Sequence, residues 1–188
     1  MFIEPFRSGR KKGWIEVICG CMFSGKTEEL IRRLKRVQIA GQKAEIFKPW
    51  NDTRFHPVDI VSHNATSIRS TPVENHYNLF LLTSDVDVVG IDEAQFCDDG
   101  IVEVIEELVL KGMRVIVAGL DMDYTGKPFG PMPALLARAE YITKLHAICA
   151  KCGDNANYSY RKAKIDDQVL LGEMDVYEPR CRHCFYSI

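Results

Sequence analysis

The sequence has 188 residues, of which 46% are hydrophobic and 27% are charged, and its net charge is −2. This composition is typical of a globular protein with one main domain, and the near-neutral charge argues against a partner held by bulk electrostatics, such as nucleic acid. No apolar run is long enough to cross a membrane, and residues 1–13, a basic tail, lack the apolar segment of a secretory signal. We therefore expect a cytoplasmic protein without nucleic-acid or membrane partners.

The first predicted strand leads into a glycine-rich loop. Residues 14–19 are mainly apolar, the pattern G-x-x-x-x-G-K-T follows at 20–27, and helical periodicity continues over 27–40. A strand, a glycine loop and a helix in this order are the context that a phosphate-binding loop requires, whereas a glycine turn without a ligand is the alternative. Lys26 would reach the β- and γ-phosphates, and the Thr27 hydroxyl would bind Mg²⁺. The pattern predicts binding of a nucleoside triphosphate.

Strands and helices then alternate along the chain to about residue 145. Apolar runs, helical periodicity and the glycine and proline residues between them predict their bounds. The predicted strands are 43–48, 59–62, 68–73, 86–91, 113–120 and 141–145, and the predicted helices are 75–82, 98–111 and 134–139. The alternation indicates an α/β fold with a parallel sheet and crossover helices. We expect a main domain over 14–145 and a small lobe over 146–188.

Two loops at the carboxyl ends of predicted strands carry polar side chains beside the phosphate loop. Asp92 follows the strand 86–91, where a P-loop enzyme holds Mg²⁺, and the Glu93 carboxylate can remove a proton from a nucleophile. The alternative is that both acids only cap the next helix. In the loop 51–57, Arg54 can neutralise charge on a transferring phosphoryl group, or it can form a surface ion pair. The aromatic residues near strand ends are either loop packing or a slot for a flat base.

The small lobe contains two C-x-x-C pairs. Four thiolates from two such pairs suit a tetrahedral Zn²⁺ of structural role, because a closed site leaves no position for catalysis. Redox dithiols and a ligand role for His183 are the alternatives. The ligands of the zinc site are predicted to be Cys149, Cys152, Cys181 and Cys184. Residues 153–180, between the pairs, must form a long loop that projects from the metal site.

Taken together, the segments GCMFSGKT, NDTRFH, GIDEAQF, GLDMDYTGKPFG, CAKCG and YEPRCRHC resemble the type II thymidine kinases in order, over residues 14–188. The resemblance implies a RecA-like P-loop domain with a central parallel sheet, followed by a small zinc-ribbon lobe that carries a lasso loop. It also implies transfer of the γ-phosphate of ATP to the 5′-hydroxyl of thymidine, and of deoxyuridine, to give dTMP in nucleoside salvage. The cofactors would be structural Zn²⁺ and Mg²⁺ with ATP, dTTP would be a feedback inhibitor, and the protein would be a homotetramer.

The resemblance also assigns roles to individual residues. The catalytic residues would be Glu93 as general base, Arg54 and Lys26. Those that bind ATP and Mg²⁺ would be Gly20, Cys21, Met22, Phe23, Ser24, Gly25, Lys26, Thr27, Asp52, Asp92 and Gln95. Those that bind thymidine would be Met22, Phe96, Leu120, Tyr124, Phe129, Ser159, Gln168, Leu170, Gly172 and Tyr177, many of those in the lasso through backbone groups.

Two other functions compete with a nucleoside kinase. Asp92-Glu93-Ala94-Gln95 is similar to a helicase motif, but such motors need two RecA-like domains and this chain has room for one. The other rival is a zinc-ribbon interaction protein whose phosphate loop acts as a switch without a small-molecule acceptor. Phosphorylation of a nucleoside distinguishes the kinase from both.

Overall fold

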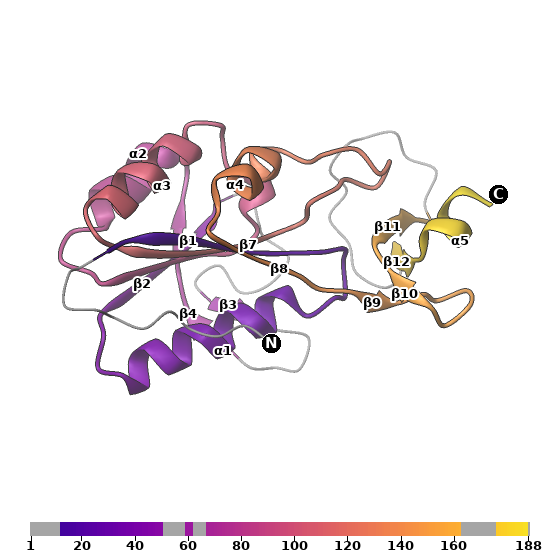
Figure 1. Cartoon of the computed structure of the whole chain (residues 1–188), viewed down its shortest axis with the longest axis horizontal. Helices are drawn as coiled ribbons and strands as arrows, with labels where there is room; N and C mark the ends of the chain where they lie inside the picture. Colours follow the sequence, from indigo (N-terminus) through magenta and orange to yellow (C-terminus); the bar gives the residue numbers. More distant parts are fainter. Residues whose placement is uncertain (1–11, 51–58, 62–66, 163–175, 188) are drawn as a thin grey trace.

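A computed structural model of the chain describes residues 12–50, 59–61, 67–162 and 176–187 (Figure 1). Six parallel strands form the main sheet, in the order β5-β2-β6-β7-β1-β8. These strands are β1 (Trp14–Cys19), β2 (Ala44–Pro49), β5 (Thr71–Val73), β6 (Val88–Ile91), β7 (Arg114–Gly119) and β8 (Tyr141–Lys144). Because all the strands run in one direction, the loops after β1, β2, β6 and β7 share one edge of the sheet.

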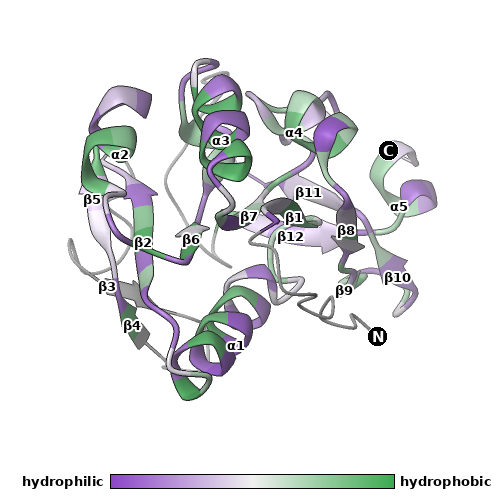
Figure 2. Cartoon of the chain, turned by 60° about the vertical axis from the view of Figure 1, so that its left-hand side comes forward, coloured by the Kyte–Doolittle hydropathy of each residue, from purple (hydrophilic) through white to green (hydrophobic). Residues whose placement is uncertain are grey.

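Helices cover both faces of the sheet, as Figure 1 shows. Helix α1 (Lys26–Ile39) lies on one face, while α2 (His76–Leu82), α3 (Ile101–Leu110) and α4 (Met132–Arg138) lie on the other. Each face has its own apolar core: Leu30 and Leu34 of α1 pack on one side, and Ile105 and Leu108 of α3 pack on the other. Figure 2 shows the alternation of apolar and polar residues around α1 and α3 that this packing requires.

A cluster of buried charged side chains surrounds Glu16, in the amino-terminal half of β1. Glu16 is fully buried, and its carboxylate accepts hydrogen bonds from Trp14 Nε1 at 2.7 Å, Arg33 Nη1 at 2.8 Å and Arg114 Nε at 2.6 Å. Arg33 also bonds to Thr143 Oγ1 of β8, at 2.9 Å. These contacts join α1, β1, β7 and β8, so the cluster fixes how the central strands sit against α1.

The small lobe lies beyond the carboxyl end of β8 (Figure 1). It consists of two antiparallel strand pairs and a short helix, namely β9 (Ala147–Ile148), β10 (Asn155–Ala156), β11 (Tyr158–Arg161), β12 (Tyr177–Arg180) and α5 (Arg182–Tyr186). Strand β9 pairs with β10, and β11 pairs with β12. The α/β fold with a parallel sheet and a small cysteine-bearing lobe is therefore confirmed, whereas the domain boundaries at 13 and 145 stay predictions.

The elements differ from the predicted ones in a few places. The predicted strand 68–73 is two strands, because β4 (Ser67–Arg69) pairs antiparallel with β3 (Asp59–Val61) and only β5 joins the main sheet. The short 3-10 helix η1 (Ala94–Phe96) after β6 and the helix α5 were not predicted. Helix α4 begins at Met132, directly after Pro131, where the fixed φ of proline favours a helix start. None of the described helices is long and apolar enough to cross a membrane.

Candidate active site

The loop between β1 and α1 has the backbone that a phosphate loop needs. Gly20 has a φ of +144°, and a Cβ there would lie 2.3 Å from the carbonyl oxygen of Leu145, so only glycine fits. Gly25 has a φ of +84° and immediately precedes the first turn of α1. No side chain of the described residues caps the start of this 14-residue helix, and the N-terminal end of a helix favours an anion.

The two polar residues that end the motif, Lys26 and Thr27, contact the loop backbone and the acid after β6. Lys26 is nearly buried, and its Nζ donates to the carbonyl oxygen of Cys21 at 2.9 Å, which holds the ammonium group over the loop. Thr27 Oγ1 lies 3.2 Å from Asp92 Oδ2, so the strand acid and the loop hydroxyl meet. A hydroxyl and a carboxylate side by side are oxygen ligands of the kind that Mg²⁺ prefers, and they fit that ion.

Glu93 is held in an uncommon backbone conformation beside this pair. Its φ and ψ are 51° and 38°, a left-handed conformation that costs free energy in a residue with a Cβ. The Gln95 side-chain amide bridges it to the next strand end: Nε2 donates to Glu93 Oε2, and Oε1 accepts from Leu120 N at 2.9 Å. Gln95 is 2% exposed, so its own amide group is shielded from solvent. Gln95, which is predicted to bind ATP and Mg²⁺, thus contacts Glu93, which is predicted to be the general base.

The predicted thymidine-binding residues form three contacts near the ends of β6 and β7. Phe96 and Phe129 meet edge to face with ring centroids 5.6 Å apart. Tyr124 and Tyr177 are joined by Arg161, whose guanidinium lies 3.6 Å from the Tyr124 ring centroid and donates to the Tyr177 hydroxyl at 2.8 Å. Sequence reasoning missed Arg161, although an arginine in the pattern YSYR, on a strand of a small lobe, was the available signal.

The third contact joins the phosphate loop to the small lobe. Ser159 Oγ of β11 accepts a hydrogen bond from Met22 N at 3.0 Å, and Ser159 is buried. The structure therefore places Ser159, which is predicted to bind thymidine, against Met22, which is predicted to contact both ATP and thymidine. The remaining predicted residues, Asp52, Arg54, Gln168, Leu170 and Gly172, lie outside the described residues.

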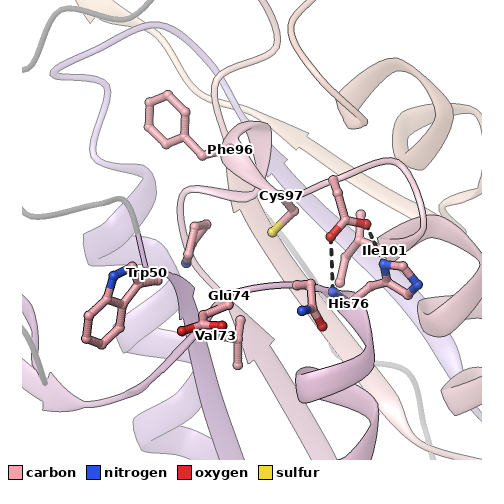
Figure 3. Close-up of a pocket in the computed structure, with 10 residues that line it drawn as sticks. Trp50, Val73, Glu74, His76, Phe96, Cys97 and Ile101 are labelled. Carbon is pink, nitrogen blue, oxygen red and sulfur yellow. Dashed lines mark hydrogen bonds and ion pairs between the residues drawn. The ribbon is translucent and has the colours of Figure 1, made fainter.

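A pocket of about 170 Å³ opens at the carboxyl ends of β2, β5 and β6 (Figure 3). Phe96 and Trp50 line it from two sides, and the Glu74 carboxylate lies near Trp50. His76 Nδ1 lies 2.5 Å from a carboxylate oxygen of Asp98, which fixes the imidazole at one wall. Among the described residues that are predicted to bind a substrate, only Phe96 lines this pocket.

The four cysteines of the small lobe form one cluster. The Sγ atoms of Cys149, Cys152, Cys181 and Cys184 all lie within 4.8 Å of one another, and His183 is not part of the group. The Cys152 and Cys181 sulfurs are 3.6 Å apart, close to the roughly 3.8 Å edge of a tetrahedron of thiolates around Zn²⁺. Cys184 N points at Cys181 Sγ at 3.4 Å, as a backbone donor to a thiolate does. The donor set fits a tetrahedral metal site.

The cysteines of the cluster differ in their pKa values: hydrogen bonds with the Cys152 and Cys181 thiols raise the pKa of Cys184, whereas that of Cys149 is lowered. Burial raises the pKa of Cys149, but backbone N–H groups directed at its sulfur outweigh burial and lower the pKa to about 6. This favours the thiolate, which is the form that binds a metal. By contrast, burial raises the pKa of Cys19 to about 11 and that of Cys97 to about 12, so both stay neutral thiols. Cys19 belongs to the sheet core.

Comparisons with known proteins show which family this chain resembles. A family model described as "Thymidine kinase" matches residues 13–185. The chain is 60% identical over 182 residues to a thymidine kinase of Bacteroides thetaiotaomicron, covering 97% of this chain and 92% of that protein. It is 58% identical over 175 residues to one of Porphyromonas gingivalis, covering 93% and 86% respectively. A thymidine kinase of Rhodothermus sp. is 57% identical over 187 residues, covering 98% of this chain and 88% of the relative.

Proposed function

This chain belongs to the thymidine kinase family, and on that basis we propose which of its residues carry out the transfer of phosphate from ATP to thymidine. It is an ATP-dependent nucleoside kinase. The observation that carries the proposed assignment is the meeting of Thr27, Asp92 and Glu93 at the mouth of the glycine-rich loop. A phosphate cradle, a metal-binding pair and a carboxylate base are the parts that phosphoryl transfer to a hydroxyl needs.

The loop residues 20–27 bind the ATP phosphates in this proposal. Backbone N–H groups at the start of α1 donate to phosphate oxygens, and Lys26, which bonds to the Cys21 carbonyl, can turn its ammonium group to the β- and γ-phosphates. Thr27 and Asp92 would hold Mg²⁺, which neutralises charge on the transferring phosphoryl group. Asp52 and Arg54 are proposed to help at the same edge, Asp52 in the metal site and Arg54 on the transferring phosphate.

Glu93 acts as the general base on the 5′-hydroxyl. Its carboxylate follows β6 directly, and its N–H donates to Asp92 Oδ1 at 3.0 Å, so the base is tied to the metal-side acid. The Gln95 amide donates to Glu93 Oε2, which fixes the orientation of the carboxylate that takes the proton. A base that lies beside an acceptor hydroxyl favours transfer to thymidine over hydrolysis of ATP.

The nucleoside binds between the sheet edge and the small lobe. Phe96 and Phe129 supply flat apolar walls, and Tyr124 supplies another, on which Arg161 is stacked. Such surfaces suit a pyrimidine ring. Met22, Leu120, Ser159, Tyr177 and the lasso residues Gln168, Leu170 and Gly172 complete the proposed set. Deoxyuridine lacks only the methyl group of thymidine, so we propose it as a second substrate.

The four-cysteine cluster holds a structural Zn²⁺ in this proposal. Four thiolates leave the ion no open position, so its role is to fix the base of the lobe and not to act on substrate. The lobe also bears the proposed lasso, the long loop between the two cysteine pairs, which would close over the nucleoside and exclude water from the reaction.

Further proposals concern regulation, assembly and location. dTTP carries the base of the product and a triphosphate, so we propose that it inhibits by occupying both substrate regions. We also propose a cytoplasmic homotetramer. Exposed apolar side chains support an assembly: Tyr77 and Leu81 lie one helical turn apart on the outer surface of α2, with exposed fractions of 69% and 75%. Light scattering tests the tetramer, and a monomer at micromolar concentration contradicts it.

A phosphotransfer assay tests the assignment. Purified protein with ATP and Mg²⁺ is offered thymidine, deoxyuridine, deoxycytidine and single-stranded DNA in separate reactions, and dTMP formation is measured. We expect thymidine and deoxyuridine to be phosphorylated in preference to deoxycytidine. Stimulation of ATP hydrolysis by DNA, with no nucleoside phosphorylated, would support a motor and contradict the proposal.

A further inference from the structure

The phosphate loop is built against the four-cysteine lobe and not only against the sheet. Figure 1 shows the loop between β1 and α1 passing beside β9 at the entrance to the lobe. Each of the loop residues 20–22 contacts either the lobe itself or the residue that immediately precedes it. Gly20 lies against the Leu145 carbonyl, and Met22 N donates to Ser159 Oγ at 3.0 Å. Between them, Cys21 makes the most buried of the three contacts.

Cys21 belongs to the core of the small lobe although its chain position is in the main domain. It is 2% exposed and packs in one apolar cluster with Ala147, Cys149, Ala156 and Cys181. Two of these neighbours are members of the metal cluster. Cys21 Sγ donates to the Ala156 carbonyl oxygen at 3.3 Å, across 135 positions of sequence.

The backbone of the same residue reaches the catalytic side. The Cys21 carbonyl oxygen accepts from Lys26 Nζ at 2.9 Å, so the residue contacts the lobe through its side chain and the phosphate-binding lysine through its backbone. A displacement of the lobe would therefore move the Cys21 peptide group and the position of Lys26. Because these contacts are buried, the connection is short and packed, which is what transmits a displacement.

We propose that Cys21 is a positioning residue that holds the phosphate loop in its nucleotide-binding shape by anchoring it to the four-cysteine lobe. Nucleotide binding and metal binding are therefore coupled, although the metal touches no nucleotide atom. The inference rests on the proposed function, because it takes the loop to bind ATP and the cluster to bind Zn²⁺. Coupling between two binding equilibria is reciprocal. Bound ATP must therefore lower the Kd for zinc by the same factor by which bound zinc lowers the Kd for ATP.

The test measures both equilibria in the zinc-loaded full chain. Zinc affinity is measured by equilibrium competition with a zinc-selective chromophoric chelator, with and without a saturating non-hydrolysable ATP analogue and Mg²⁺. Affinity for the analogue is measured by calorimetry. In the wild type we expect the analogue to lower the Kd for zinc about fivefold or more. In Cys21→Ala we expect that factor to fall towards one and the Kd for the analogue to rise about fivefold, with zinc still bound.

Two further variants distinguish the loss of the Cys21 contact from a general loss of stability. Cys21→Ser keeps an O–H donor towards the Ala156 carbonyl and should retain most of the coupling. Val102→Ala removes buried apolar volume from α3, in the core on the far side of the sheet from α1, and should lower thermal stability without changing the coupling factor. This variant is the matched control for the loss of packing.

The inference is wrong if the analogue leaves the zinc affinity of the wild type unchanged, or if Cys21→Ala retains the full factor. It is also wrong if Val102→Ala loses the coupling to the same extent, because the loss would then follow general destabilisation. A wild-type protein that binds zinc but not the ATP analogue would contradict the proposed function instead.

Discussion

Replacing Gln95 by glutamate should raise the pH at which the enzyme becomes active. In the native site the Gln95 amide donates to Glu93 Oε2 and accepts from Leu120 N at 2.9 Å. Glutamate has nearly the same shape, so one of its oxygens keeps the bond from Leu120. The other oxygen then faces the Glu93 carboxylate, where an N–H group stood before. Two carboxylates at hydrogen-bond distance cannot both stay ionised, and the pair retains a proton.

The size of the effect follows from the separation and burial of the two groups. Two unit charges 4 Å apart interact by about 4 kcal/mol at an effective dielectric constant of 20, which corresponds to a pKa change of about 3. Gln95 is almost fully buried, but Glu93 is only half-buried, so solvent reduces this value. We expect the apparent pKa of the base to rise by about 1 to 3. The base works only when ionised, so activity is lost at low pH and recovers as the pH rises through the new pKa.

The pH profile of kcat/KM for thymidine measures this change in pKa. Its acid limb should move to higher pH in Gln95→Glu. At a pH below the acid limbs of both proteins, kcat/KM of Gln95→Glu should be lower than that of the wild type by about tenfold for each pH unit between the two limbs. Gln95→Met is the matched control: it removes the amide without adding a charge, so it should lower kcat while the acid limb stays near that of the wild type. A Gln95→Glu profile that superimposes on the wild-type profile would refute the arrangement of Gln95 and Glu93.

Three other substitutions give independent tests. Glu93→Gln should lower kcat by roughly 10²-fold or more and leave the Kd for ATP nearly unchanged, which steady-state kinetics and calorimetry measure; wild-type turnover would remove Glu93 as the base. Cys152→Ser should lose zinc and thermal stability together, and full zinc content by metal analysis would require another ligand set. Glu16→Leu leaves Arg33 and Arg114 buried without their shared carboxylate, so the free energy of unfolding should fall by about 3–5 kcal/mol in a denaturant titration. An unchanged midpoint would contradict that expectation.

The sequence predicted the parts of the fold that depend on local pattern. The strand before the glycine loop and the amphipathic helix after it were both present, because the periodicity of apolar residues reports which side of a segment is buried. The meeting of Thr27 and Asp92 also followed from pattern, since the carboxyl ends of parallel strands share one edge. The four-cysteine cluster followed from the spacing of its two pairs.

Contacts between distant segments could not be predicted in the same way. The Cys21 thiol and the Ala156 carbonyl are 135 positions apart, and nothing in the pattern around either residue indicates the other. Arg161 stacks on Tyr124 only because the hairpin of β11 and β12 sits over the loop after β7. The roles of Arg54 and of the lasso residues stay predictions.

The parallel order of the sheet also has a consequence for synthesis on the ribosome. Strand β1 emerges early, and its partner Arg33 lies only 17 positions after Glu16, so α1 can form at once. Arg114 of β7 lies 98 positions after Glu16, and at about 5–20 residues per second it follows some 5–20 s later. During that interval β1 lacks both of its neighbours in the sheet, β7 and β8, while its apolar residues are already outside the ribosome. The nucleotide loop therefore takes its final form only after most of the chain has been made.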